Sequence, residues 1–309
     1  MRTKKRPAVD RILLPHVQEV WRGIREKPAN FVYYTSAEVA ESLLKTKTLW
    51  LRNAQMMNDF MEIEQGLENL HGCFQGQSGK RLEAAWNSCF PGVADEIKEH
   101  FDAWVHEFRT ETYIMCVSEH CKEEDLTGRL SMWRAYGGRA GIALVFGADV
   151  LADESLDVGA YTMPVLYMDA PSLQNELDGV ATQIDSRQEE IKSCGRDWLR
   201  WEMFYLLLSV ALSSKHPGFA EEREWRIVSS RSFRNESVRR DVEVIGGIPQ
   251  PIVKLRLDEV GELQDILKKV IIGPCASPLI VMSALEQLLQ NAGVNNARER
   301  IVISNIPLR

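Results

Sequence analysis

The sequence lacks a long apolar run, a paired-cysteine motif and a glycine-rich phosphate loop. Its longest apolar stretch, Met203 to Leu212, has about half of the roughly 20 residues that span a bilayer, and Ser209 interrupts it. The basic N-terminus is not followed by an apolar segment, which argues against a secretory signal. No C-x-x-C pair occurs among the six cysteines. We therefore expect reduced thiols in a cytoplasmic protein, with no membrane segment and no metal site. Because no glycine-rich loop follows a strand-like segment, the Rossmann and Walker types of nucleotide site have no support.

The composition is typical of a soluble globular protein. The 309 residues are 45% apolar and 26% charged, which excludes a disordered tail or a fibrous repeat. There are 37 Lys and Arg residues against 44 Asp and Glu residues, a formal net charge of −7. This acidic balance argues against broad electrostatic binding to nucleic acid. Basic residues gather in the N-terminal tail and in a Ser/Arg/Asn-rich stretch that ends at Arg239 and Arg240, which we expect to be a loop.

Hydrophobic periodicity predicts a mixture of strands and helices without strict alternation. Strands are predicted at 31–35, 48–52, 112–118, 141–146, 163–168, 222–228, 251–257, 270–272 and 301–306. Helices are predicted after Ser36, from Phe60, from Val93, near 132–136, and over 173–191, 197–213 and 278–289. Ser36 or Thr35 is the predicted N-cap of the first, and Thr35 with Glu38 fits a capping box. This pattern favours an α+β fold over a doubly wound sheet, with helical insertions near 72–110 and 170–214.

The stretch from Glu222 to Val228 carries the most chemical information. Alternate residues of a strand share a face, so Glu222, Glu224 and Arg226 would point one way. Trp225 and Ile227 would then anchor the opposite face in the core. Such a row of charges suits stabilisation of developing positive charge or hydrogen bonding to sugar hydroxyls. A solvated face with cross-strand ion pairs is the competing interpretation.

Three further groups have both a functional and a structural interpretation. Asn58, Asp59 and Glu62 could bind a ligand or simply cap a helix. Trp133 and Tyr136 share a helix face and could stack on a ligand or pack in the core. Lys215 lies in the loop before the acidic strand and could contact phosphate.

A set of short motifs resembles a large bacterial family described as a domain of unknown function, common in mobile elements and near phage-defence genes. The motifs run from about residue 30 to about residue 275 and comprise Tyr33-Tyr34-Thr35-Ser36, Leu49-Trp50-Leu51, Asn58-Asp59 with Glu62, Cys116-Val117-Ser118, Trp133 with Tyr136 and Gly141, Val165-Leu166-Tyr167, Lys215, Glu222 to Arg226, and Ile271 to Pro274. Because the motifs are spread along the chain, we expect one domain over 30–309 after a basic extension at 1–29.

The order of strands is also similar to that of ADP-ribosyltransferases, which implies a mixed, largely antiparallel split sheet and NAD as co-substrate. In that resemblance Glu224 stabilises an oxocarbenium-like transition state, Glu222 orients the acceptor and Ser118 supports the glutamate. Where that superfamily offers His or Arg on its first strand, this chain has Tyr34, which supplies a hydrogen bond without charge. The residues then expected to bind the nucleotide are Tyr34, Thr35, Ser36, Asn58, Asp59, Trp133, Tyr136, Lys215 and Arg226.

Three functions follow as hypotheses. The first is an ADP-ribosyl-transferring enzyme that uses NAD on a protein or nucleic-acid acceptor, acting as a toxin or phage-defence effector. The second is a metal-dependent nuclease or phosphodiesterase in which Asp59, Glu62, Glu222 and Glu224 hold Mg²⁺. The third is a non-catalytic module that senses a nucleotide-like molecule or a partner through Tyr34, Trp133 and Tyr136. The oligomeric state cannot be inferred from these motifs.

Overall fold

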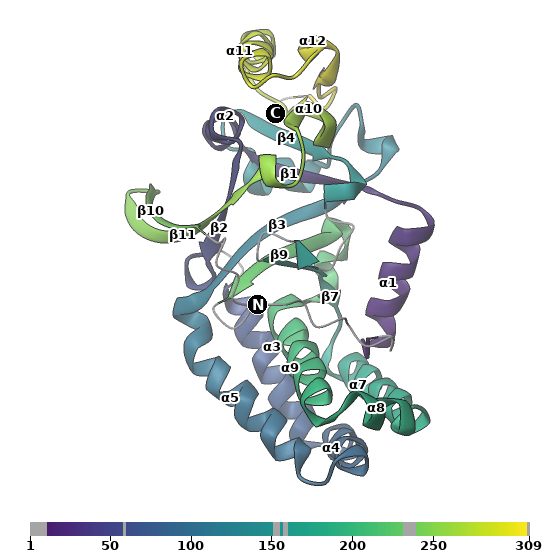
Figure 1. The fold of residues 1–309 in the computed structure, drawn as a ribbon. Helices are drawn as coiled ribbons and strands as arrows, with labels where there is room; N and C mark the ends of the chain where they lie inside the picture. Colours follow the sequence, from purple (N-terminus) through teal and green to yellow (C-terminus); the bar gives the residue numbers. More distant parts are fainter. Residues whose placement is uncertain (1–10, 58–59, 151–154, 157–159, 231–238, 308–309) are drawn as a thin grey trace. The chain divides into compact units, whose positions relative to one another are not determined.

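The computed structural model describes residues 11–57, 60–150, 155–156, 160–230 and 239–307 (Figure 1). These residues form two compact units, each built from three chain segments. The first unit comprises Met1–Gly23, Ala54–Thr110 and Pro164–Ala220, and the second comprises Ile24–Asn53, Glu111–Met163 and Glu221–Arg309. The expectation of one domain over 30–309 stays a prediction.

The first unit is mainly helical (Figure 1). Its elements are α1 (Pro15–Glu26), η1 (Ala54–Met56), α3 (Phe60–Gln75), α4 (Gln77–Cys89), α5 (Val93–Glu111), β7 (Leu166–Tyr167), α7 (Ala170–Ser186), α8 (Gln188–Cys194), α9 (Arg196–Ser213), β8 (Ser214–Lys215) and the start of η4 (Pro217–Glu222). The helix α9 is apolar on most sides and packs against α3. Close approach is possible because Gly66 has no side chain, since a Cβ there would lie 2.6 Å from the carbonyl oxygen of Ala211.

The second unit is built on an eleven-stranded sheet. Its strands are β1 (Asn30–Ser36), β2 (Thr48–Asn53), β3 (Thr112–His120), β4 (Gly141–Phe146), β5 (Ser155–Leu156), β6 (Ala160–Pro164), β9 (Glu224–Ser230), β10 (Arg239–Ile245), β11 (Ile248–Arg256), β12 (Leu267–Ile272) and β13 (Ile301–Ile303). Its helices are α2 (Ala37–Thr46), η2 (Lys122–Glu124), α6 (Leu130–Tyr136), η3 (Ala148–Val150), η6 (Leu257–Glu259), α10 (Leu263–Ile266), α11 (Pro278–Asn291) and α12 (Ala297–Arg300). The fold is therefore α+β with a mixed, largely antiparallel sheet, as the sequence predicts.

The sheet divides at β3. Along one edge β3 pairs with β9 over Thr112 to Ser118. On its other edge it pairs with β2 at Tyr113 and Ile114 and with β1 from Ser118 to His120. Beyond this strand the order runs through β2 and β11 to β10 on one side, and through β1, β4 and β12 to β13 on the other. Ser118, near the end of β3, is thus paired with β1 on one edge and with β9 on the other.

The helix α6 covers one face of β1 and β4. Its Met132 and Trp133 pack with Val32 and Tyr34 of β1 in a buried cluster that extends to β4 and β12. Opposite, Phe31 lies edge-on to Trp225 with ring centroids 5.4 Å apart. Trp225 and Ile227 are each 1% exposed, so the prediction that they anchor the core is confirmed.

Several predicted elements differ from those in the structure. The single strand predicted at 163–168 is two short strands, β6 and β7, in different sheets. The long helix predicted over 173–191 is interrupted at Arg187 and forms α7 and α8. Of the two N-cap residues predicted for the first helix, Ser36 is confirmed: it caps α2 and accepts a hydrogen bond from the Val39 amide at 3.4 Å, so the predicted Thr35–Glu38 capping box is wrong.

The Arg-rich stretch was predicted to be a loop, but its end belongs to a strand. Arg239 and Arg240 open β10, which pairs with β11 over its whole length. The alternating Val242 and Val244 that follow are the period-2 signal for this strand. Residues 231–238, with Arg231 and Arg234, lie outside the described residues.

Candidate functional site

Three neighbouring strands bring three of the predicted site residues to one face of the sheet. Val32 of β1 lies opposite Ser118 of β3, and Ser118 lies opposite Glu224 of β9. Residues opposite one another share a face, and so does Tyr34, two residues after Val32. Tyr34, Ser118 and Glu224 therefore stand on the same side of three adjacent strands, although up to 190 residues separate them in sequence.

Glu224 is a buried carboxylate held by a buried cation. It is 4% exposed, and its Oε1 accepts a hydrogen bond from Nε of Arg226 at 2.8 Å. Arg226 is itself 1% exposed. The interpretation of this strand as a solvated face is wrong, because both charges are removed from water. A buried pair of this kind costs desolvation energy and is a weak source of stability.

Ser118 presents a buried hydroxyl that no described residue satisfies. The residue is 1% exposed, and its Oγ has no hydrogen-bond partner within the described part of the chain. A buried hydroxyl without a partner costs about 1–3 kcal/mol. Because Ser118 stands directly opposite Glu224, this unused hydrogen-bonding capacity lies beside the buried carboxylate.

Glu222 does not share the strand face with Glu224. The strand β9 begins at Glu224, and Glu222 is the last residue of η4. Between them Arg223 has a φ of 45°, in the left-handed region that non-glycine residues rarely adopt. This turn breaks the predicted alternation, so the expected row of two carboxylates and a guanidinium reduces to Glu224 and Arg226.

The turn before Glu224 is fixed from several directions. The Glu119 amide donates to the carbonyl oxygen of Arg223 at 2.9 Å. The Arg223 side chain contacts Glu124 and the sulfur of Cys121. A strained residue persists only where its surroundings hold it, and strained residues cluster at functional sites.

Arg129 connects this turn to the first strand. Its backbone amide donates to Oη of Tyr34 at 2.9 Å, and its Nη1 donates to the carbonyl oxygen of Glu222 at 2.6 Å. The same guanidinium donates to the Glu119 carbonyl at 3.1 Å and forms an ion pair with Glu124 at 3.1 Å. Through its amide and its guanidinium, Arg129 thus joins Tyr34 of β1 to the ends of β3 and η4, and we regard it as a positioning residue.

The predicted aromatic residues lie in the core of the second unit. Tyr34 and Trp133 are 4% and 6% exposed and meet edge-to-face, with ring centroids 4.8 Å apart. Burial raises the pKa of Tyr34 to about 12, and Trp133 donates its indole N–H to the Thr127 carbonyl at 2.9 Å. Tyr136 is partly buried against this cluster. These contacts are those of packed aromatic residues with satisfied polar groups.

The other predicted site residues have the following positions. Thr35 is buried on β1, and Ser36 caps α2. Lys215 is buried on β8 of the first unit, where its Nζ lies 5.1 Å from the Phe219 ring centroid. Asn58 and Asp59 lie outside the described residues, as does the side chain of Glu62.

Sequence reasoning missed two arginines near this face. Arg129 has no neighbouring motif that identifies it, because its partners lie up to 95 residues away. Arg52 of β2 lies opposite Ile114, two residues from the Cys116 that faces Arg226, so it shares the face of Glu224. Burial lowers the pKa of Arg52, and its Nη2 donates to Gln250 at 3.2 Å. Arg52 directly follows the strand-like stretch Leu49 to Leu51, and this position is the signal that could have identified it.

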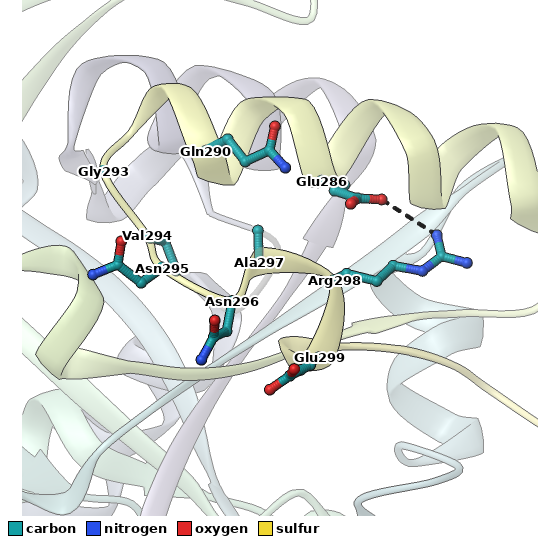
Figure 2. Close-up of a pocket in the computed structure, with 9 residues that line it drawn as sticks. All are labelled: Glu286, Gln290, Gly293, Val294, Asn295, Asn296, Ala297, Arg298 and Glu299. Carbon is teal, nitrogen blue, oxygen red and sulfur yellow. Dashed lines mark hydrogen bonds and ion pairs between the residues drawn. The ribbon is translucent and has the colours of Figure 1, made fainter.

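Metal and pocket geometry point to no further site. Within the ranges that the structure describes, no group of three or more His, Cys, Asp or Glu side chains could hold a metal ion. A polar hollow of about 490 Å³ lies at the turn between α11 and α12, lined by residues such as Gln290, Asn295 and Arg298 (Figure 2). None of the predicted site residues lines it. No helix of the described chain is long and apolar enough to cross a bilayer.

Comparison with known proteins identifies part of the chain. A family model described as a protein of unknown function (DUF2971) matches residues 132–227. The matched segment contains Trp133, Tyr136 and the whole stretch from Glu222 to Arg226. Neither a curated protein nor a solved structure matches the chain. The resemblance to a domain of unknown function is therefore confirmed over residues 132–227, which match the DUF2971 family model.

Proposed function

We propose that the protein is an ADP-ribosyltransferase-like enzyme that uses NAD, with Glu224 as its catalytic carboxylate. The observation that carries this proposal is the alignment of Tyr34, Ser118 and Glu224 on one face of three adjacent strands. The unsatisfied hydroxyl of Ser118 beside Glu224 fits a ligand that bears its own hydrogen-bonding groups, such as a ribose. In a cell such an enzyme would act on a protein or nucleic-acid acceptor in the cytoplasm, as a toxin or a phage-defence effector.

Cleavage of the bond between nicotinamide and ribose in NAD is favoured by a fixed negative charge in an environment that excludes water. NAD supplies a glycosidic bond to nicotinamide whose cleavage leaves positive charge on the ribose. A carboxylate that is already positioned stabilises such charge, and the low dielectric of a buried site strengthens the effect. Arg226 holds the Glu224 carboxylate in a fixed orientation through their buried 2.8 Å ion pair. Ser118 is placed to hydrogen-bond a sugar hydroxyl or the carboxylate itself.

Binding of a dinucleotide also needs positive charge. Tyr34 carries none, and its hydroxyl already accepts the Arg129 amide hydrogen. Arg52 and Arg226 are the guanidinium groups that β2 and β9 place on the face of Glu224. We therefore propose that Arg52, rather than Tyr34, supplies charge to the diphosphate.

The test is nicotinamide release. The full chain is incubated with NAD alone and with labelled NAD and a cell extract, and both nicotinamide release and transferred label are measured. We expect activity in the wild type and at least a 100-fold loss in Glu224→Gln, a change that keeps an oxygen facing Arg226. The matched control is Glu262→Gln, an exposed glutamate of the same unit.

The outcome depends on folding as well as on activity. Urea unfolding of each variant separates loss of the carboxylate charge from loss of structure. A folded Glu224→Gln protein as active as the wild type would refute the proposal, and so would a wild type that neither releases nicotinamide nor transfers label.

A further inference from the structure

Glu119 lies on β3 one residue beyond Ser118, and its side chain points to the opposite face of the sheet. Ser118 pairs with Glu224, and successive residues of a strand point to opposite faces. Glu119 therefore shares a face with Phe31, which lies opposite it on β1. The residue is partly buried there. Because the sheet lies between them, the Glu119 side chain does not reach a ligand on the face of Glu224.

The amide, the carbonyl and the carboxylate of Glu119 all make hydrogen bonds. Its amide donates to the carbonyl oxygen of Arg223 at 2.9 Å, and its Oε1 accepts the indole N–H of Trp225 at 2.8 Å. Its carbonyl oxygen accepts a hydrogen bond from Nη2 of Arg129 at 3.1 Å. Arg223 and Trp225 are the residues directly before and after Glu224 in the chain. One residue thus holds both chain neighbours of Glu224.

The bond to Trp225 runs diagonally across the strand pair. Val117 lies directly opposite Trp225, and Glu119 follows two residues later on the same face. Trp225 is 1% exposed, and its ring meets Phe31 edge-on. A buried indole N–H usually has an acceptor, and breaking such a bond costs desolvation energy. Removal of the Glu119 carboxylate would therefore disturb the residue that directly follows Glu224.

The residue before Glu224 is constrained as well. Arg223 has a φ of 45°, and the Glu119 amide holds its carbonyl oxygen. The ladder of β3 and β9 ends at the Ser118–Glu224 pair, so Glu224 is the first residue of its strand. Backbone at the end of an element is held less firmly than backbone within it. The contacts of Glu119 on either side of Glu224 supply the missing constraint.

We propose that Glu119 is a positioning residue that fixes the carboxylate of Glu224 from the far face of the sheet. The inference rests on the proposed function, in which Glu224 stabilises positive charge on the ribose. Arg226 orients the carboxylate itself, and Glu119 fixes the segment of chain from which that side chain projects. A misplacement of about 1 Å can lower a rate by about 100-fold. Because Glu119 does not touch the ligand, its loss lowers kcat and leaves KM for NAD largely unchanged.

Three substitutions separate the reach of the side chain from its charge. Glu119→Gln keeps an oxygen at the same reach without the charge, Glu119→Asp keeps the charge but withdraws the oxygen by one methylene, and Glu119→Ala removes both. In steady-state release of nicotinamide from NAD by the full chain, Glu119→Gln should keep the wild-type kcat. The other two should lose about 10–100-fold in kcat at an unchanged KM. Glu123→Ala, at an exposed position of η2, is the control and should behave as the wild type.

A second measurement reports the geometry without activity. Nε–H of Arg226 donates to Glu224, so its NMR signal is sensitive to the place of the carboxylate. Glu119→Ala and Glu119→Asp should shift this signal and speed its hydrogen exchange at least about tenfold, because the segment around Glu224 opens more often. Glu119→Gln and Glu123→Ala should leave the signal as in the wild type.

The two proposals fail in different ways. A wild type that releases no nicotinamide refutes the enzymatic proposal, and the Arg226 signal then decides whether Glu119 fixes Glu224. An active wild type together with a folded Glu119→Ala variant of full kcat refutes the role of Glu119 alone. Full kcat in Glu119→Asp combined with loss in Glu119→Gln would also overturn it, since charge rather than the bond to Trp225 would then act. If Glu119→Ala does not fold, the comparison of Glu119→Gln with Glu119→Asp decides the question.

Discussion

Ser118→Ala tests whether Ser118 acts in the site or only in the fold, because we expect the variant to be more stable but less active than the wild type. The Ser118 hydroxyl is buried and finds no partner in the described structure, so the folded state carries its desolvation cost. That cost is about 1–3 kcal/mol, and deleting one oxygen leaves little space behind. We expect the free energy of unfolding to rise by about 1 kcal/mol, or the melting temperature by a few degrees.

Activity should fall with the same change. One hydrogen bond to an ionised group or a sugar hydroxyl in the transition state is worth about 1.5–3 kcal/mol. This corresponds to a decrease of about 10–100-fold in the rate of nicotinamide release. Urea unfolding and nicotinamide release are measured on the same preparation, so the two effects are compared directly.

Thr162→Val is the matched control for this experiment. Thr162 of β6 is also buried with an unpartnered hydroxyl in the described structure, and it lies outside the Val32–Ser118–Glu224 row. The control should gain stability without losing activity. A destabilised Ser118→Ala variant would show that the hydroxyl has a partner, and a stabilised variant with wild-type activity would remove Ser118 from the site.

Further predictions concern the ion pair, the packing of Trp133 and the response to acid. Glu224→Ala should lower the free energy of unfolding by about 3–5 kcal/mol, because Arg226 is left buried without its carboxylate. Replacing Glu224 by Leu and Arg226 by Met together should restore much of this loss. Equal losses for the single and the double variant in urea unfolding would contradict this. Gly273→Ala should lower the free energy of unfolding by about 1–3 kcal/mol, since its Cβ would lie 2.8 Å from the Trp133 ring. Gly72→Ala, at an exposed position of α3, should raise it by about 0.5–1 kcal/mol. A Gly273→Ala variant with unchanged stability would show that Trp133 can move. Burial raises the pKa of Asp125, but hydrogen bonds from Lys269 and His120 outweigh it and hold that pKa below its ordinary value. Its stabilising contribution is therefore complete above the unfolded pKa of about 3.9 and is lost as pH falls through the lower folded value, so Asp125→Asn should flatten the dependence of unfolding free energy on pH below about pH 4; an unchanged slope would contradict this.

Local patterns were sufficient wherever one element decides the outcome. Alternation placed Trp225 and Ile227 together on one core-facing side of β9, and the helical spacing from Val93 identified α5. Patterns failed where the backbone departs from its regular period. Because Arg223 has a left-handed backbone conformation, Glu222 lies outside the strand, and the residue types of Glu222 to Arg226 do not predict this turn.

The sequence by itself determined the α+β class, most element positions and the family resemblance that the DUF2971 match confirms over residues 132–227, because periodicity and turn chemistry act over a few residues. Only the tertiary structure decided that Ser118 lies opposite Glu224, 106 positions later in the chain, and that Arg226 is buried together with Glu224. Strand pairing and burial depend on which distant segments meet, and the energy of a charge is set by that environment rather than by its residue type.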